Sequence, residues 1–175
     1  MKNHTKQLVT AALCTALGLL LPTVFHMFGG AGPAFLPMHI PILLCGLLCG
    51  WQYGVLCGIV VPLLSSLLTG MPALYPTGLA MCLELACYGA VSGLLYGKWG
   101  IYPSLISAML AGRAVSGCAN AILLGMAGKA YGLGAFLSAS FAVALPGILI
   151  QLIFIPAIVK LLERAGYHAA GNQHV

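Results

Sequence analysis

The chain has 175 residues, of which 61% are hydrophobic and only 5% are Asp, Glu, Lys or Arg, and its net charge is +5. A soluble domain carries about 25% charged residues, so this chain cannot cover a water-facing globule with charge, and lipid must be the solvent for most of its surface. No soluble basic face remains to bind nucleic acid, and no long polar segment remains for a second domain. Residues 1–175 are therefore predicted to form a single transmembrane domain.

Six apolar runs, separated by glycines, prolines and charges, predict six membrane-spanning helices. The run that follows Lys2 and Lys6 is too long for the apolar region of a signal peptide, so it is interpreted as a retained first helix. Loops at 29–33, 70–76 and 128–134 are predicted on one side of the membrane. The helices are predicted at residues 7–28, 36–51, 53–70, 76–97, 102–127 and 135–163.

The distribution of cations orients the predicted bundle. Five of them fall on the side that holds both termini and the even-numbered loops, and Lys129 falls on the other side. Cytoplasmic loops carry an excess of Lys and Arg. The predicted fold class is thus an all-α integral membrane protein, a bundle of six transmembrane helices with both termini cytoplasmic. The five cations are Lys2, Lys6, Lys98, Lys160 and Arg164.

Small residues recur every four positions along several of the predicted helices. In lipid, close backbone approach through small residues is what allows helices to associate. For the glycines, packing inside the bundle is the favoured interpretation, whereas for Ala12 and Ala16 both internal packing and docking to a partner stay open. The glycines are Gly46, Gly50, Gly54 and Gly58, followed by Gly89, Gly93 and Gly97.

All seven cysteines fall inside predicted helices. No loop carries a Cys-x-x-Cys with matching histidines, the arrangement typical of metal sites. Cysteine is a small residue that is easily buried among apolar side chains, so we expect these thiols to pack in the bundle, with no structural disulfide and no metal site.

Two charges lie deep in the apolar runs, Glu84 in the fourth predicted helix and Arg113 in the fifth. A charge at mid-membrane costs several kcal/mol, so it usually faces the protein interior and marks a partner or a pathway. At 1.5 Å per residue, Glu84 lies ~12 Å below the outer boundary and Arg113 ~16 Å above the inner one. An ion pair is therefore geometrically allowed, and two roles stay open: a buried pair that holds the bundle together, or a polar floor that binds a substrate. Gln151, deep in the sixth helix, is interpreted as structural.

Further residues are candidates for contact with a ligand. Asn120 lies seven residues beyond Arg113 on the same helix face. His39 lies between two prolines in a segment that is predicted to be irregular, and non-helical backbone at membrane depth needs protein or a water-filled cavity around it. With Met38 and Tyr75, His39 is predicted to form a lid over an outward-facing cavity, although a lone histidine is also common as a structural residue.

The sequence lacks several motifs of enzymes and pumps. It has no G-x-x-x-x-G-K-[ST] phosphate-binding loop, no H-E-x-x-H and no G-x-S-x-G. It also lacks the dense intramembrane Asp, Glu and His of a proton-coupled pump. We therefore expect neither an enzyme nor a self-sufficient active transporter, and no cofactor.

The pattern as a whole resembles the substrate-binding S component of energy-coupling factor (ECF) vitamin transporters. The resemblance covers nearly the whole chain, and residues 12–16, Ala-Leu-Cys-Thr-Ala, are similar to the A-x-x-x-A docking motif of that family. The stretches at 36–41, 70–76 and 84–89 are similar to those of one of its branches. Residues 38–41 are also similar to the N-terminal Met-His of cobalt and nickel S components, but here they are internal, so no free amine completes a metal site.

The resemblance implies a subunit that captures a water-soluble vitamin with high affinity at a prokaryotic plasma membrane. Ala12 and Ala16 would dock on a transmembrane coupling subunit that carries two cytosolic ATPases. The site would lie at the outer ends of helices four to six, under the first and third loops. A buried Arg beside a Glu suits a carboxylate such as pantothenate, with a pyrimidine or pyridoxine-type ligand close behind. The competing classes are an uncoupled channel, a secondary carrier, an accessory membrane subunit and, less favoured, a cobalt or nickel uptake component.

Overall fold

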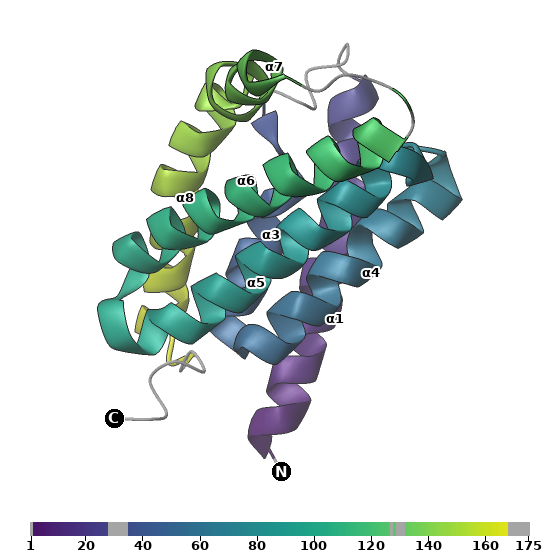
Figure 1. Ribbon diagram of the computed structural model, residues 1–175. Helices are drawn as coiled ribbons and strands as arrows, with labels where there is room; N and C mark the ends of the chain where they lie inside the picture. Colours follow the sequence, from purple (N-terminus) through teal and green to yellow (C-terminus); the bar gives the residue numbers. More distant parts are fainter. Residues whose placement is uncertain (1, 28–34, 127, 129–131, 168–175) are drawn as a thin grey trace.

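The structure, a computed structural model, describes residues 2–27, 35–126, 128 and 132–167 (Figure 1). In this part of the chain the regular structure is entirely helical, which confirms the predicted all-α class. The elements in chain order are α1 (Lys2–Met27), α3 (His39–Cys49), α4 (Trp51–Thr69), η1 (Leu74–Gly78), which is kinked at the extended residue Tyr75, α5 (Leu79–Trp99), α6 (Ile101–Met126), α7 (Leu133–Leu137), the π-helical η2 (Ser138–Val143) and α8 (Leu145–Arg164).

Five of the described helical stretches are long and apolar enough to cross a membrane, within α1, α4, α5 with η1, α6 and α8. The remaining long run, predicted as a helix over 36–51, forms only the 11-residue α3. Its start is delayed because Leu36 has a left-handed backbone, with φ 49°, and Pro37 follows. A helix of this length rises about 16 Å, roughly half of a ~30 Å hydrocarbon core. The chain is a multi-pass membrane bundle, while a sixth crossing stays a prediction.

The predicted helix over 135–163 is wrong as a single element. The structure divides it into α7, η2 and α8, with Pro146 in the first turn of α8. Proline has no backbone N–H, and its ring clashes with the carbonyl four residues earlier. The chain therefore widens into a π-helical segment before the proline and starts a new α-helix at it.

Successive long helices run in opposite directions, so the end of one helix and the start of the next lie at the same end of the bundle (Figure 1). The turns at Gly50 and Gly100, the first residues of α1 and the last residues of α8 lie at one end. Segment η1 and helix α7 lie at the other end. The predicted loop at 29–33 and the cation Lys129 lie outside the described residues.

Helix α5 packs closely against α3 and α4 through glycines. A Cβ atom added to Gly54 would lie 2.6 Å from the Gly89 carbonyl oxygen, and one added to Gly89 would meet the backbone of Gly54. Gly58 lies equally close to the α5 backbone at Leu85, with 2.5 Å to its carbonyl. The interpretation of the glycines as internal packing residues is confirmed for these positions.

We expect Gly89→Ala to lower the free energy of unfolding by about 1–3 kcal/mol or more, because the added methyl group has backbone rather than a movable side chain in its way. Gly125→Ala is the matched control, since a Cβ atom there meets nothing within 4 Å. Unfolding of the two variants in detergent, followed by circular dichroism, measures the difference. Equal stability of the two variants would contradict the close approach of α4 and α5.

Candidate functional site

Glu84 of α5 is the centre of a buried polar cluster formed by three helices. Its Oε1 accepts a hydrogen bond from the Tyr88 hydroxyl at 3.2 Å and lies 3.0 Å from Nη1 of Arg113 in α6. His39, the first residue of α3, places Nε2 3.5 Å from the same oxygen and packs edge-on against the Tyr88 ring, with centroids 5.2 Å apart. The Ser116 side chain also lies near the Glu84 carboxylate.

The cluster is shielded from the surroundings of the bundle. The exposed fractions are 3% for His39, 4% for Glu84 and 9% for Arg113. A buried charge is costly unless it is paired and hydrogen-bonded, and here the carboxylate is paired with the Arg113 guanidinium and accepts a hydrogen bond from the Tyr88 hydroxyl. The structure therefore contains the Glu84–Arg113 ion pair, which the similar depths of the two residues in their predicted helices had allowed.

The helices bring these side chains to a similar level for a geometric reason. Counted from the end of the bundle that holds the Gly50 and Gly100 turns, His39 lies ~15 Å up α3 and Arg113 ~18 Å up α6. On the same count Glu84 lies ~22 Å up α5, and Gln151 ~20 Å up α8. Because α3 is short, its first residue reaches mid-depth rather than the far surface. The cluster therefore lies near the middle of the bundle.

Polar nitrogen atoms without a hydrogen-bond partner lie at this depth. Among the described residues, no hydrogen-bond partner is found for Nε of Arg113, for either ring nitrogen of His39, or for Nε2 of Gln151. Gln151 is only 1% exposed. Glu84 Oε1 is already engaged, so Nε of Arg113 and Nε2 of Gln151 are left as donors, whereas a neutral His39 ring has one donating and one accepting nitrogen. Such a set suits a ligand rich in hydrogen-bond acceptors, because buried polar groups normally have partners.

The residues predicted to contact a ligand are only partly brought together. Glu84, Arg113 and His39 meet, whereas Met38 is 4% exposed and belongs to the apolar core. Asn120 donates a hydrogen bond to the Ser116 carbonyl at 2.9 Å, and its amide lies 3.4 Å from the Ser116 hydroxyl. The hydrogen bonds found for Asn120 among the described residues thus go to Ser116 and not to Glu84.

Tyr75 lies apart from the cluster. Its side chain is 48% exposed, and its hydroxyl donates a hydrogen bond to the Leu123 carbonyl near the end of α6, at 2.8 Å. The prediction that His39 belongs to an irregular segment is also wrong, because His39 begins α3. A proline two residues into a helix is tolerated, since the N–H it lacks has no partner within the first turn. Pro41 therefore does not break the helix.

Sequence reasoning missed Tyr88 and Ser116 as parts of the cluster. A signal for both was available, because residues three or four apart share a helix face. Tyr88 lies four residues after Glu84, and Ser116 lies three residues after Arg113. Helix periodicity around each buried charge would have singled them out.

The predicted docking residues lie on the outside of the bundle. Ala12 and Ala16 are both exposed on α1. Ala12 and its neighbours Ala11 and Thr15 line a shallow apolar groove of about 220 Å³, whose other wall is formed by α4 residues such as Leu56 and Val60. The two alanines therefore form an exposed surface of small residues on α1 and do not pack inside the bundle.

Comparison with known families gives one match. The model of the family described as "ECF transporter, substrate-specific component" matches residues 6–162. Neither the curated proteins nor the solved structures gave a significant match. The matched residues run from the first turns of α1 to near the end of α8, and they include the polar cluster and the alanine face.

Proposed function

Because the chain belongs to the family of substrate-specific components of ECF transporters, we propose that it captures a water-soluble vitamin or vitamin precursor for ATP-driven uptake. The protein lies in a prokaryotic plasma membrane, crosses it six times and has both termini in the cytoplasm. It hands the substrate to a transmembrane coupling subunit that carries two cytosolic ATPases. The five long apolar helices and the family match support this assignment.

The buried cluster around Glu84 is the observation that carries the substrate proposal. The Nε of Arg113 has no hydrogen-bond partner among the described residues, and an arginine is well suited to two parallel hydrogen bonds with a carboxylate. We therefore favour a carboxylate-bearing substrate of the pantothenate kind, with Arg113 as its donor and Glu84 balancing the charge. A pyrimidine or pyridoxine-type substrate, which presents ring acceptors and hydroxyl groups, is the second choice.

The exposed alanine face of α1 supports docking to the coupling subunit. Helices in lipid associate where small residues allow their backbones to approach closely. Ala12 and Ala16 present such a surface on a helix whose other exposed residues are mostly large and apolar, for example Leu13 and Leu20.

We expect the purified chain to bind pantothenate, or failing that pyridoxine or a hydroxymethylpyrimidine, in the absence of ATP. In vesicles that contain this chain alone, the same compound is not accumulated against a gradient, because the sequence has no phosphate-binding loop. Isothermal titration calorimetry measures the binding, and uptake of radiolabelled substrate measures the transport. Accumulation without the coupling module would contradict the proposal and favour a secondary carrier.

A further inference from the structure

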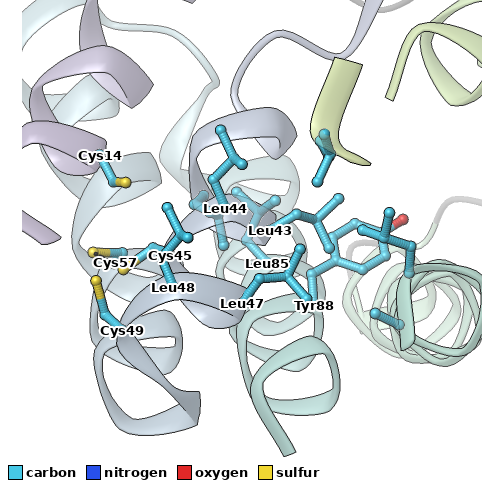
Figure 2. Close-up of a cluster of buried hydrophobic side chains, with 14 of the residues drawn as sticks. Cys14, Leu43, Leu44, Cys45, Leu47, Leu48, Cys49, Cys57, Leu85 and Tyr88 are labelled. Atoms are coloured by element: carbon cyan, nitrogen blue, oxygen red, sulfur yellow. Dashed lines mark hydrogen bonds between the residues drawn. The ribbon is translucent and has the colours of Figure 1, made fainter. Parts of the chain in front are cut away.

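Four of the seven cysteines gather in one buried cluster, separate from the polar cluster around Glu84. Figure 2 shows the side chains of Cys45, Cys49 and Cys57 close together between α3 and α4, with Cys14 of α1 on the same side of the bundle. Cys45 is central, because its thiol interacts with all three others. The shortest contact between two sulfur atoms, 3.4 Å, joins Cys45 and Cys57. All four are free thiols in the structure.

One of these thiols borders the membrane. Cys57 lines the apolar groove between α1 and α4, on the same wall as Leu56 and Val60. Its sulfur lies 3.2 Å from the Thr15 hydroxyl oxygen and 3.6 Å from the Ala11 carbonyl. Cys45 lies behind it and is fully buried. A small uncharged molecule dissolved in lipid can therefore approach Cys57 first, whereas a charged one would have to leave water.

We propose that Cys45 and Cys57 form a redox-active dithiol, which small uncharged two-electron oxidants reach through the groove between α1 and α4. Oxidation breaks the two S–H bonds and forms one S–S bond. The oxidant accepts two electrons and both protons.

The Cys45–Cys57 pair is favoured because it is the one sulfur–sulfur contact found among the hydrogen bonds of the described residues. A disulfide needs an S–S distance of about 2.05 Å, so the two sulfur atoms have to approach by only ~1.4 Å. Cys45 and Cys49 lie four residues apart on one helix, where Cβ atoms are about 5–6 Å apart, whereas a disulfide needs about 3.8 Å. Cys45–Cys57 is therefore a better pair than Cys45–Cys49.

A neutral disulfide also fits this environment better than a bound metal ion does. Metal ligation requires thiolates, and an unbalanced charge in an apolar interior is costly. Among the described residues, no three His, Cys, Asp or Glu side chains are arranged to hold a metal ion. Disulfide formation leaves no charge behind.

With an azo compound such as diamide as the oxidant, the reaction proceeds in two steps. The Cys57 sulfur adds to one azo nitrogen, and the thiol proton passes to the other nitrogen. The Cys45 sulfur then attacks the Cys57 sulfur, and the S–N bond breaks. The Cys45 proton goes to the departing nitrogen, so that the azo compound leaves as a hydrazine. The new bond draws the Cys57 sulfur toward α3 and away from Thr15 and Ala11 of α1.

The test treats the full-length purified protein with diamide and, separately, with oxidised glutathione, which is charged and too large for the groove. After the free thiols are blocked, non-reducing digestion and mass spectrometry map the disulfides. We expect a Cys45–Cys57 disulfide in most of the chains treated with diamide and at least ~10-fold less of it with oxidised glutathione.

Two variants complete the test. Cys57→Ser is expected to abolish intramolecular disulfide formation, and Cys118→Ser, which removes an exposed thiol of α6, is expected to leave it unchanged. Circular dichroism establishes that each variant is folded. If a variant does not fold, the disulfide mapping of the unsubstituted protein still tests the proposal. The proposal is overturned if the unsubstituted protein forms no intramolecular disulfide, if oxidised glutathione reacts as well as diamide, or if Cys57→Ser forms as much of one as the unsubstituted protein.

Discussion

Replacing Glu84 by Gln while Arg113 stays is expected to lower the free energy of unfolding by about 3–5 kcal/mol, because a buried guanidinium loses its only carboxylate among the described contacts. The reverse change, Arg113→Gln, leaves the buried carboxylate with only hydroxyl groups and the His39 ring near it, and an equally large loss is expected. Unfolding in detergent measures both. Glu163→Gln is the matched control: Glu163 accepts a hydrogen bond from Tyr96 at 2.6 Å near the end of α8, and an amide oxygen preserves that bond.

The double variant separates a structural pair from a ligand site. Glu84→Gln with Arg113→Gln removes both charges together, so much of the lost stability is expected to return. If Arg113 binds the substrate, the folded double variant binds at least ~10-fold more weakly, a loss of ~1.4 kcal/mol or more. A folded double variant with an unchanged dissociation constant would remove both residues from the site.

The second large effect is expected at the alanine face of α1. Ala12→Trp combined with Ala16→Trp is expected to abolish substrate uptake by the assembled transporter while the affinity for substrate stays within about twofold. The indole rings would stand between α1 and the coupling subunit, where small side chains permit close contact. Both alanines are exposed on α1, a helix that contributes no residue to the described polar cluster, so binding of the substrate itself is expected to be spared.

Ile106→Trp with Leu110→Trp is the control for this experiment, because both residues are exposed, four positions apart and on a different helix, α6. Uptake by this variant is expected to be near normal. Equal loss of binding and of uptake in the alanine variant would show that the tryptophans disturb the bundle rather than its docking.

The parts of the fold that follow from helix geometry could be predicted from the sequence. Glu84 and Arg113 lie in consecutive antiparallel helices, so their depths follow from a constant rise per residue. The observed ion pair agrees with that calculation. The close approach at Gly54 and Gly89 follows in the same way from the four-residue spacing of the glycines.

Other features depend on the rotation of each helix and on which helices are neighbours, and neither is encoded in local patterns. The meeting of Cys14, Cys45 and Cys57 requires α1 to pack beside α3 and α4 with these faces turned inward. The loop position of Tyr75 predicts a role in a lid, and the structure adds what the pattern does not show, a hydrogen bond from its hydroxyl to the Leu123 carbonyl. Pro146 divides the last predicted helix, whereas Pro62 and Pro156 lie inside intact ones, so the presence of a proline alone did not reveal where a helix ends.

The shortness of α3 has an electrical consequence. Because His39 begins α3 near half-depth, a ligand that enters from outside and reaches Glu84 and Arg113 has crossed about half of the membrane. Moving a full elementary charge across 100 mV changes the free energy by about 2.3 kcal/mol, so half of that path is worth about 1.2 kcal/mol. For an anionic substrate and an inside-negative potential of 100 mV, this corresponds to roughly sevenfold weaker capture. Affinity in energised cells is therefore expected to fall below that in detergent for an anionic vitamin and to be insensitive to voltage for a neutral one.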